Sequence, residues 1–189
     1  YPAPDAEIAA RKAAKELGGA VVVKAQVWVT GRKSKGFIKF CKTPEAAKEA
    51  AEEMLGQVVK NFPIDKVLVE QMLDVDRELF AAIIIDDAAK QPVVIFSSLG
   101  GSGIEEIARE HPEAVARRHI DVNTGLRDFE AREVVRHTTL DRSLYNKAAQ
   151  ALVNLYKAAR LGETRSIEIN PLIITRDGNW VAADCHATG

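Results

Sequence analysis

The chain has 189 residues, of which 47% are hydrophobic and 28% are charged, as in ordinary globular proteins. Its 26 basic and 27 acidic residues give a net charge of -1, so the composition points to neither a nucleic-acid nor a membrane partner. No apolar run approaches the roughly 20 residues that a membrane span requires. Cys41 and Cys185 form no paired motif, so we expect a reducing compartment: the cytoplasm, or the mitochondrial matrix in a eukaryote.

The first part of the chain alternates between helix and strand patterns. Thr43-Pro44 is a helix-starting signal, with a capping threonine and a proline at the first helical position. A basic, glycine-bearing loop is expected at Thr30–Gly36. The expected elements are a helix from Asp5 to Leu17, strands Ala20–Val29 and Phe37–Cys41, a helix from Pro44 to the stop at Gly56, and a strand Lys66–Gln71.

The second part contains two strand pairs and two helices. Ser102 and Glu105 match the Ser-x-x-Glu capping box, directly after Gly100-Gly101. The expected elements are strands Glu78–Ile85 and Val93–Ser98, a helix following Ser102, a helix from Asp141 to Arg160, and strands Ile167–Thr175 and Asn179–Asp184. Because both strand pairs form hairpins, a purely parallel sheet is excluded and an α+β class is expected.

The secondary-structure pattern breaks at Asp74-Val75-Asp76-Arg77, so we expect two lobes, residues 1–74 and 75–189. No flexible linker is visible there, and a ligand site at the interface of the lobes is therefore expected. The chain opens at Tyr1 without a methionine and enters a helix almost at once, so we expect it to be a piece of a longer polypeptide.

The last strand pair carries the most specific polar pattern. Arg176-Asp177-Gly178 predicts a tight turn, and a hairpin centred on Asp177 puts Asn170 opposite Asp184. Glu168 lies two residues before Asn170 and so shares its face. One amide oxygen and two carboxylates suit Mg²⁺, which prefers hard oxygen ligands. A hairpin whose polar residues simply face water gives the same pattern, so both interpretations stay open here.

Three further segments are candidates, each with an ordinary alternative. Lys24 interrupts a valine run and precedes the loop Gly31–Gly36, which could fold over phosphates or be a charged surface turn. The strand end Leu68–Leu73, followed by Glu78, could meet an adenine ring and a ribose, or be a solvated turn. Gly100-Gly101-Ser102 could bind an anion or be a capped turn.

Taken together and in this order, these fragments resemble the ATP-grasp region of the succinyl-CoA synthetase β subunit, a tricarboxylic acid cycle enzyme, and its relatives. The relatives include malate–CoA ligase, citryl-CoA synthetase and ATP-citrate lyase. The match runs through nearly the whole chain, over residues 21–27, Gly31-Arg32, 68–70, 77–79, Gly100-Gly101, 167–172 and Asp184. Its most specific element is Ile-Glu-Ile-Asn-Pro-Leu with Asp184 fourteen residues after Asn170.

The resemblance implies an ATP-grasp fold of two α+β lobes with the nucleotide cleft between them, its start lying before Tyr1. Residues 1–74 would be the smaller, lid lobe, and residues 75–189 the larger lobe with the Mg²⁺ site. The implied roles are Lys24 at the nucleotide phosphates, Gly31 and Arg32 in the loop that covers them, Glu70 and Leu73 at the adenine, Glu78 at the ribose, Asn170 and Asp184 on Mg²⁺, and Glu168 facing a phosphohistidine.

In the enzymes that the chain resembles, ATP phosphorylates a histidine, the phosphoryl group passes to a carboxylic acid, and CoA displaces phosphate from the acyl phosphate. That histidine lies in a Gly-His-Ala-Gly-Ala setting in an α subunit or a fused CoA-ligase half. None of His111, His119, His137 and His186 has this context. We therefore expect such a partner, expect Mg²⁺ and ATP as cofactors with GTP left open, and expect this chain alone to bind nucleotide without completing the reaction.

Three departures from the family pattern keep other functions open. Lys33 replaces the second glycine of Gly-Arg-Gly, no acidic residue precedes Gly100-Gly101, and Asp184-Cys185-His186 replaces Asp-Gly-Lys. One alternative is a non-catalytic nucleotide-binding or assembly module. Another is an ATP-grasp carboxylate–amine ligase, against which the Ile-Glu-Ile-Asn-Pro-Leu segment argues. The acid substrate stays open, because acyl choice lies largely outside this region.

Overall fold

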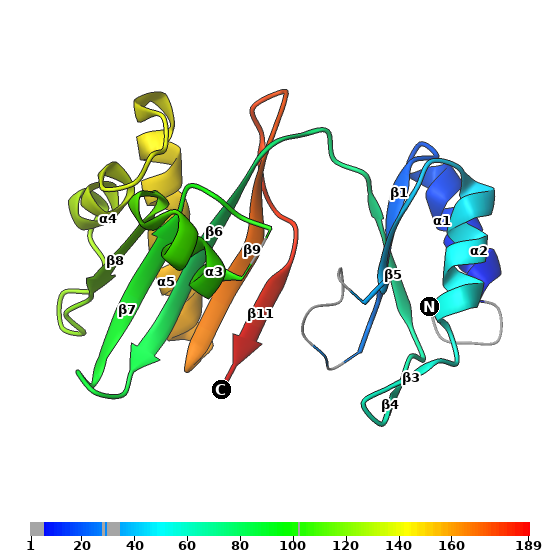
Figure 1. Cartoon of the computed structure of the whole chain (residues 1–189), viewed down its shortest axis with the longest axis horizontal. Helices are drawn as coiled ribbons and strands as arrows, with labels where there is room; N and C mark the ends of the chain where they lie inside the picture. Colours follow the sequence, from blue (N-terminus) through cyan, green and yellow to red (C-terminus); the bar gives the residue numbers. More distant parts are fainter. Residues whose placement is uncertain (1–5, 28, 30–34, 102) are drawn as a thin grey trace. The chain divides into compact units, whose positions relative to one another are not determined.

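The computed structural model describes residues 6–27, 29, 35–101 and 103–189. The chain divides into two compact units, Tyr1–Leu73 and Asp74–Gly189, whose helices and strands are drawn in Figure 1. Each unit has its own hydrophobic core. Both units combine helices with antiparallel sheets, which confirms the predicted α+β class. In the part of the chain that is described, no helix is both long and apolar enough to cross a membrane.

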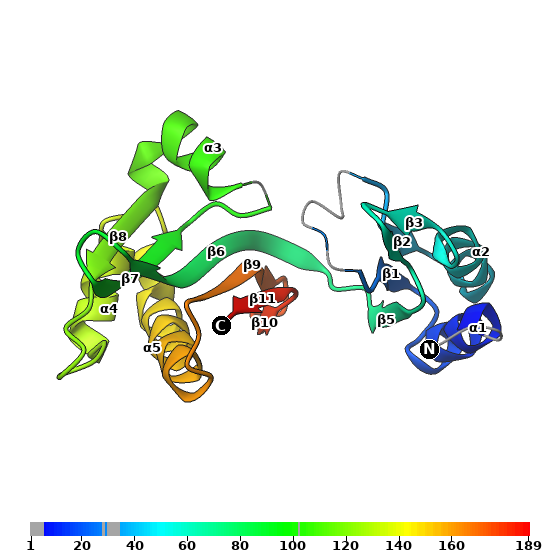
Figure 2. The ribbon, with the colours of Figure 1, turned by 90° about the horizontal axis from the view of Figure 1, so that it is seen from below.

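The first unit is a small sheet with helices on one face. Its elements are α1 Ala6–Glu16, β1 Val21–Ala25, β2 Ile38–Cys41, α2 Pro44–Met54, β3 Val58–Val59, β4 Phe62–Pro63 and β5 Val67–Gln71. The strand order is β2-β1-β5, and α1 and α2 pack on the same face (Figures 1 and 2). Thr43 caps α2 as predicted, since its Oγ1 accepts from the Ala46 N–H at 3.2 Å.

Alternation along β1 sorts its side chains between the two faces of the sheet. Val21, Val23 and Ala25 belong to the core beneath the helices. Val22 and Lys24 therefore point to the opposite face. The strand ends at Ala25, earlier than the sequence pattern predicts, and Trp28 lies outside the described residues.

The second unit is a larger antiparallel sheet. Its elements are β6 Val75–Asp86, β7 Gln91–Ser97, α3 Ile104–Glu110, η1 Pro112–Ala114, β8 Val115–His119, α4 Asp128–Arg136, η2 Arg142–Leu144, α5 Tyr145–Leu161, β9 Ser166–Thr175, β10 Trp180–Ala182 and β11 Cys185–Thr188. The strand order is β10-β9-β6-β7-β8, and β11 also pairs with β9. Figure 2 shows α4 and α5 on one face of this sheet and α3 on the other side.

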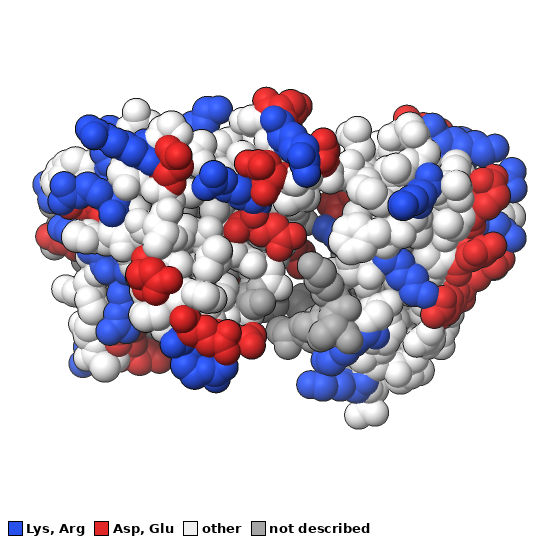
Figure 3. Space-filling view, turned by 45° about the horizontal axis from the view of Figure 1, so that its top comes forward, with Lys and Arg blue, Asp and Glu red and all other residues white. Residues whose placement is uncertain are grey.

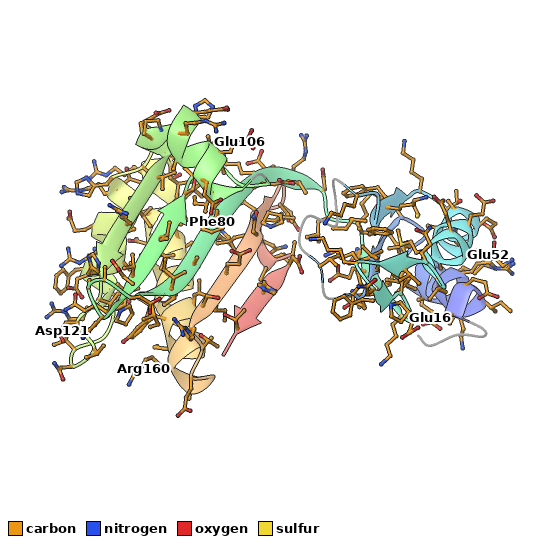
Figure 4. All side chains as sticks on the ribbon, turned by 60° about the horizontal axis from the view of Figure 1, so that its bottom comes forward. Glu16, Glu52, Phe80, Glu106, Asp121 and Arg160 are labelled. Atoms are coloured by element: carbon orange, nitrogen blue, oxygen red, sulfur yellow. The ribbon has the colours of Figure 1, made fainter. Side chains whose placement is uncertain are left out.

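A bulge interrupts the central pairing of β6 with β9. Leu79 pairs with Leu172 and Ala81 with Ile169, so Asn170 and Pro171 together oppose Phe80, which is labelled in Figure 4. The bulge reverses the alternation of β9. The residues of β9 that pack toward the core are odd-numbered before the bulge and even-numbered after it: Ile167, Ile169, Leu172 and Ile174.

Several elements differ from the sequence prediction. Strand β8, helix α4 and strand β11 were not predicted, and the expected strand Asn179–Asp184 is split between β10 and the turn before β11. The predicted cap Ser102 lies outside the described residues, and Gly103 is the N-cap residue of α3 without a side-chain hydrogen bond. Basic and acidic side chains are interspersed on the surface shown in Figure 3, in keeping with the near-zero net charge.

The buried carboxylate of Glu130 caps the N-terminus of helix α4. Glu130 is only 8% exposed and accepts from the Arg127 backbone N–H at 3.1 Å, from the Arg127 guanidinium and from the Arg118 guanidinium at 3.0 Å. Hydrogen bonds from the Arg127 side chain outweigh burial and lower the pKa of Glu130 to about 2. The carboxylate therefore stays ionised and caps the helix N-terminus.

We expect Glu130→Ala to lower the free energy of unfolding of the second unit by about 1–2 kcal/mol, because α4 loses its capping carboxylate. Since the folded pKa lies below the ordinary 4.5, this stabilisation is fully present above pH 4.5 and is lost as the pH falls toward 2. Urea unfolding measures the loss; in a Trp28→Phe background the fluorescence of Trp180 reports on the second unit alone.

Glu133→Ala is the matched control on the same helix. Glu133 pairs with Arg136 at the surface, so we expect a change within about 0.5 kcal/mol. Equal losses for the two variants would contradict the assignment of Glu130 as the cap, and so would a Glu130→Ala loss that is undiminished near pH 2.

Candidate functional site

The final hairpin pairs Asn170 with Asp184. The Asn170 backbone N–H donates to the Asp184 carbonyl at 3.1 Å, and the neighbouring pairs are Ile169 with Cys185 and Leu172 with Ala182. The predicted position of Asn170 opposite Asp184 is therefore confirmed, with Asp177 in the turn between them. Their side chains start from adjacent backbone positions at the point where β9 bulges.

Glu168 lies on the face of the sheet that α4 and α5 do not cover. Its neighbours Ile167 and Ile169 pack toward the core, so the side chain between them points the other way. It stands directly opposite His186 on β11. Glu168, Asn170 and Asp184 are all half-buried rather than exposed, which argues against a hairpin whose polar residues simply face water.

The Gly100-Gly101 pair reaches this hairpin from the end of β7. The Gly101 N–H donates to the Asn170 side-chain oxygen Oδ1 at 3.3 Å. The Glu78 carboxylate lies against Gly101, since a Cβ on Gly101 would clash with its Oε2. Glu78, Gly101 and Asn170 are thus neighbours, although they come from β6, a loop and β9.

The environment of Glu168 favours its protonated form. Burial raises the pKa of the Glu168 carboxyl, the negative charges of Glu105 and Asp184 act in the same direction, and His186 opposes them. Glu105 lies in the first turn of α3. The site therefore gathers carboxylates from three elements, and any cation or cationic group that binds there would be attracted by them.

In the first unit, two of the predicted nucleotide-binding residues pair with each other. Lys24, only 8% exposed, forms an ion pair with Glu70, which lies on the neighbouring strand β5. Leu73 follows β5 and is half-buried. Gly31 and Arg32 lie outside the described residues.

The structure thus gathers the predicted residues in two groups. Lys24 and Glu70 meet in the first unit, while the second unit brings together Glu78, Glu168, Asn170 and Asp184. Sequence reasoning gave Glu105 only a capping role and Gly101 only a place in a possible anion-binding turn, and it linked neither residue to this hairpin. The register that predicts Asn170 opposite Asp184 also predicts Glu168 opposite His186, and could have located that histidine.

The donor set of the hairpin suits a hard cation. Asn170 offers an amide oxygen and Asp184 a carboxylate, the ligand types that Mg²⁺ combines with waters and substrate phosphates. Within the described residues, no three His, Cys, Asp or Glu side chains gather in a way that could hold a metal ion by themselves. The residues present therefore fit a cation completed by a ligand better than a closed structural metal site.

A family model described as an ATP-grasp domain matches residues 3–174. The chain belongs to the ATP-grasp family. Among curated relatives, the β subunit of the GDP-forming succinate–CoA ligase of Thermus thermophilus is 44% identical over 188 residues, which are 97% of this chain and 50% of the relative. The β subunit of the ADP-forming enzyme of Haloarcula marismortui is 41% identical over 188 residues, 97% of this chain and 49% of the relative. The chain therefore spans about half the length of these relatives.

Solved structures confirm the predicted ATP-grasp fold. The dinucleotide-forming acetyl-coenzyme A synthetase 1 of Ca. Korarchaeum cryptofilum aligns with a TM-score of 0.77 at 20% identity, over 100% of this chain and 83% of that chain. The ATP citrate lyase of Methanothrix soehngenii aligns with a TM-score of 0.75 at 20% identity, over 98% of this chain and 42% of that chain.

We expect the Glu168 carboxyl to titrate above its ordinary value of 4.5 when neither metal nor nucleotide is present, because burial disfavours its charge. Glu105→Gln should lower that midpoint by removing a nearby negative charge. A ¹³C NMR titration of the Glu168 side chain measures both effects.

Glu106→Gln makes the same change of charge on the same helix and is the matched control (Glu106 is labelled in Figure 4). It should leave the Glu168 midpoint unchanged. A midpoint at or below 4.5, or equal shifts for the two variants, would contradict this account of the site.

Proposed function

We propose that this chain is the nucleotide-binding part of an ATP-dependent acid–CoA ligase in which Mg-ATP phosphorylates a histidine of a partner subunit or domain. The observation that carries the proposal is the pairing of Asn170 with Asp184 beside the half-buried Glu168, in a chain of the ATP-grasp family. The succinate–CoA ligase β subunits that it matches, at 44% and 41% identity, support the reaction class.

In this proposal, each unit contributes its own groups to the nucleotide. Lys24, with Gly31 and Arg32, binds the phosphates, where cations offset the charge of the phosphoryl group in transfer. Glu70 and Leu73 lie at the adenine, and Glu78 accepts hydrogen bonds from the ribose hydroxyls. Lys24 forms an ion pair with Glu70, so a bound phosphate would compete with this carboxylate for the lysine.

Asn170 and Asp184 would hold Mg²⁺ through the amide oxygen and the carboxylate. When bound, the ion would neutralise charge on the phosphates and orient them for in-line transfer. The proposal includes the lobe assignment: residues 75–189 would be the larger lobe with the metal site, and residues 1–74 the smaller, lid lobe.

Glu168 is proposed to face the partner's histidine. A carboxyl that burial biases toward its protonated form can donate to a phosphoryl oxygen or, when ionised, accept from an imidazole N–H. The partner is then an α subunit or a fused CoA-ligase half, which would supply the acyl and CoA sites. The identity of the acid is set there.

We expect Asp184→Asn to weaken Mg²⁺-dependent nucleotide binding at least about tenfold, because a carboxylate contributes more than a neutral amide to holding a divalent cation. Isothermal titration with ATP and GTP, with and without Mg²⁺, measures the loss. Asp87→Asn is the matched control, since Asp87 is an exposed carboxylate of the same unit that pairs with Arg165. Unchanged affinity for Asp184→Asn would refute the metal assignment.

Phosphotransfer is tested with γ-³²P-labelled ATP, the protein at its full natural length and its partner subunit. We expect label on a histidine of the partner, chased by CoA and the acid substrate. Glu168→Gln should slow the labelling while nucleotide affinity stays unchanged. Tight ATP binding without any labelled histidine would instead support a non-catalytic nucleotide-binding module.

A further inference from the structure

We propose that Gly101 is a positioning residue for the metal site: its backbone N–H fixes the orientation of the Asn170 carboxamide. This inference rests on the proposed function, because the orientation matters only if the Asn170 oxygen binds a cation. It assigns a role to a loop whose sequence, Gly100-Gly101, is equally well explained as a capped turn.

The hydrogen bond specifies which end of the amide lies where. The Gly101 N–H donates to Oδ1 of Asn170 at 3.3 Å, across 69 residues of chain. An amide turned the other way would set its own NH₂ against that N–H, donor against donor. Rotation of a free asparagine amide is otherwise broad and nearly two-fold. The contact therefore fixes where the oxygen lies, and an amide oxygen has two lone pairs, so it can accept from an N–H and also bind a cation.

The backbone of Asn170 is fixed by the hairpin. Its backbone N–H donates to the Asp184 carbonyl at 3.1 Å, so the two proposed ligands share one rigid backbone pair. The amide is thus held at its backbone by the hairpin and at its oxygen by the glycine loop. Such preorganisation spares the cation the cost of ordering its ligand.

Close packing explains why both loop residues are glycines. A Cβ on Gly100 would lie 2.6 Å from the Leu79 carbonyl oxygen, so the loop backbone packs directly on the backbone of β6. Gly101 has φ +83°, a conformation that favours glycine, and a Cβ there would meet the Glu78 carboxylate. A side chain at Gly100 would have to displace the loop from the β6 backbone, and a side chain at Gly101 would strain the backbone at its positive φ, so either change would shift the Gly101 N–H relative to Asn170.

The test compares Gly101→Ala with Gly178→Ala in the protein at its full natural length. Gly178 has the same φ of +83° but nothing within 4 Å of an added Cβ, so it reproduces the backbone strain without the contact to Asn170. Gly100→Ala is a second variant that displaces the loop without a positive φ. The readout is the Mg²⁺ concentration that gives half-maximal ATP binding, with thermal unfolding to check folding.

We expect Gly101→Ala and Gly100→Ala to raise that Mg²⁺ concentration about fivefold, the usual worth of one hydrogen bond, and Gly178→Ala to leave it unchanged. In an Asn170→Ala background the glycine variants should have no further effect, because the double-mutant cycle isolates their shared contact. The Asn170 side-chain amide signals in a ¹H–¹⁵N spectrum should shift in Gly101→Ala and not in Gly178→Ala.

Two outcomes would overturn the inference alone: equal effects of Gly101→Ala and Gly178→Ala, or a Gly101→Ala effect that persists undiminished without the Asn170 side chain. Failure of the proposed function is seen separately, in the unmutated protein. If that protein binds ATP without any dependence on Mg²⁺, both the metal assignment and the positioning role of Gly101 are refuted.

Discussion

The antiparallel pairing of β6 with β9 is the constraint on which the second unit depends. These two strands bury apolar side chains against α5, yet one of them carries polar groups in its middle. The bulge at Asn170-Pro171 reconciles these demands, because it reverses the alternation so that residues on both sides of it reach the core. At the point where the alternation reverses, neither Asn170 nor Pro171 is part of the core, and Asn170 can carry a polar side chain there.

Backbone groups, rather than other side chains, do most of the positioning around these polar residues. The hairpin partner Asp184 holds Asn170 by a main-chain hydrogen bond, and the Gly101 N–H holds the side chain. Main-chain donors lie on elements that are fixed by packing, whereas long side chains lose entropy when they are ordered. In the first unit a side chain is positioned by another side chain instead: the nearly buried Lys24 forms an ion pair with Glu70 across two paired strands.

The sequence predicts those features that depend on residues close together in the chain, and it misses those that depend on distant contacts. The position of Asn170 opposite Asp184 needs only a turn at Asp177 and constant pairing, and Thr43 caps its helix within three residues. Strand β8, Val-Ala-Arg-Arg-His, and strand β11 are mostly exposed edge strands without apolar alternation, so no pattern marks them. Helix α4 begins at Asp128 after an arginine N-cap and is capped by its own Glu130, so none of the usual N-cap residues marks its start. The contact of Gly101 with Asn170 joins segments too far apart in the chain for spacing to reveal.

The bulge also has a consequence for how this part of the chain can vary. Substitutions at Asn170, Pro171 or Asp184 change chemistry while leaving the core side chains in place. A single-residue deletion at the bulge would restore plain alternation with Leu172 and Ile174 still on the core side. The one residue left between Ile169 and Leu172 would then stand opposite both Ala183 and Asp184, so the pairing that places Asn170 opposite Asp184 would be lost. Among related chains, segment 166–175 should therefore tolerate altered residues but resist gaps, so that its length is a stricter family mark than its composition.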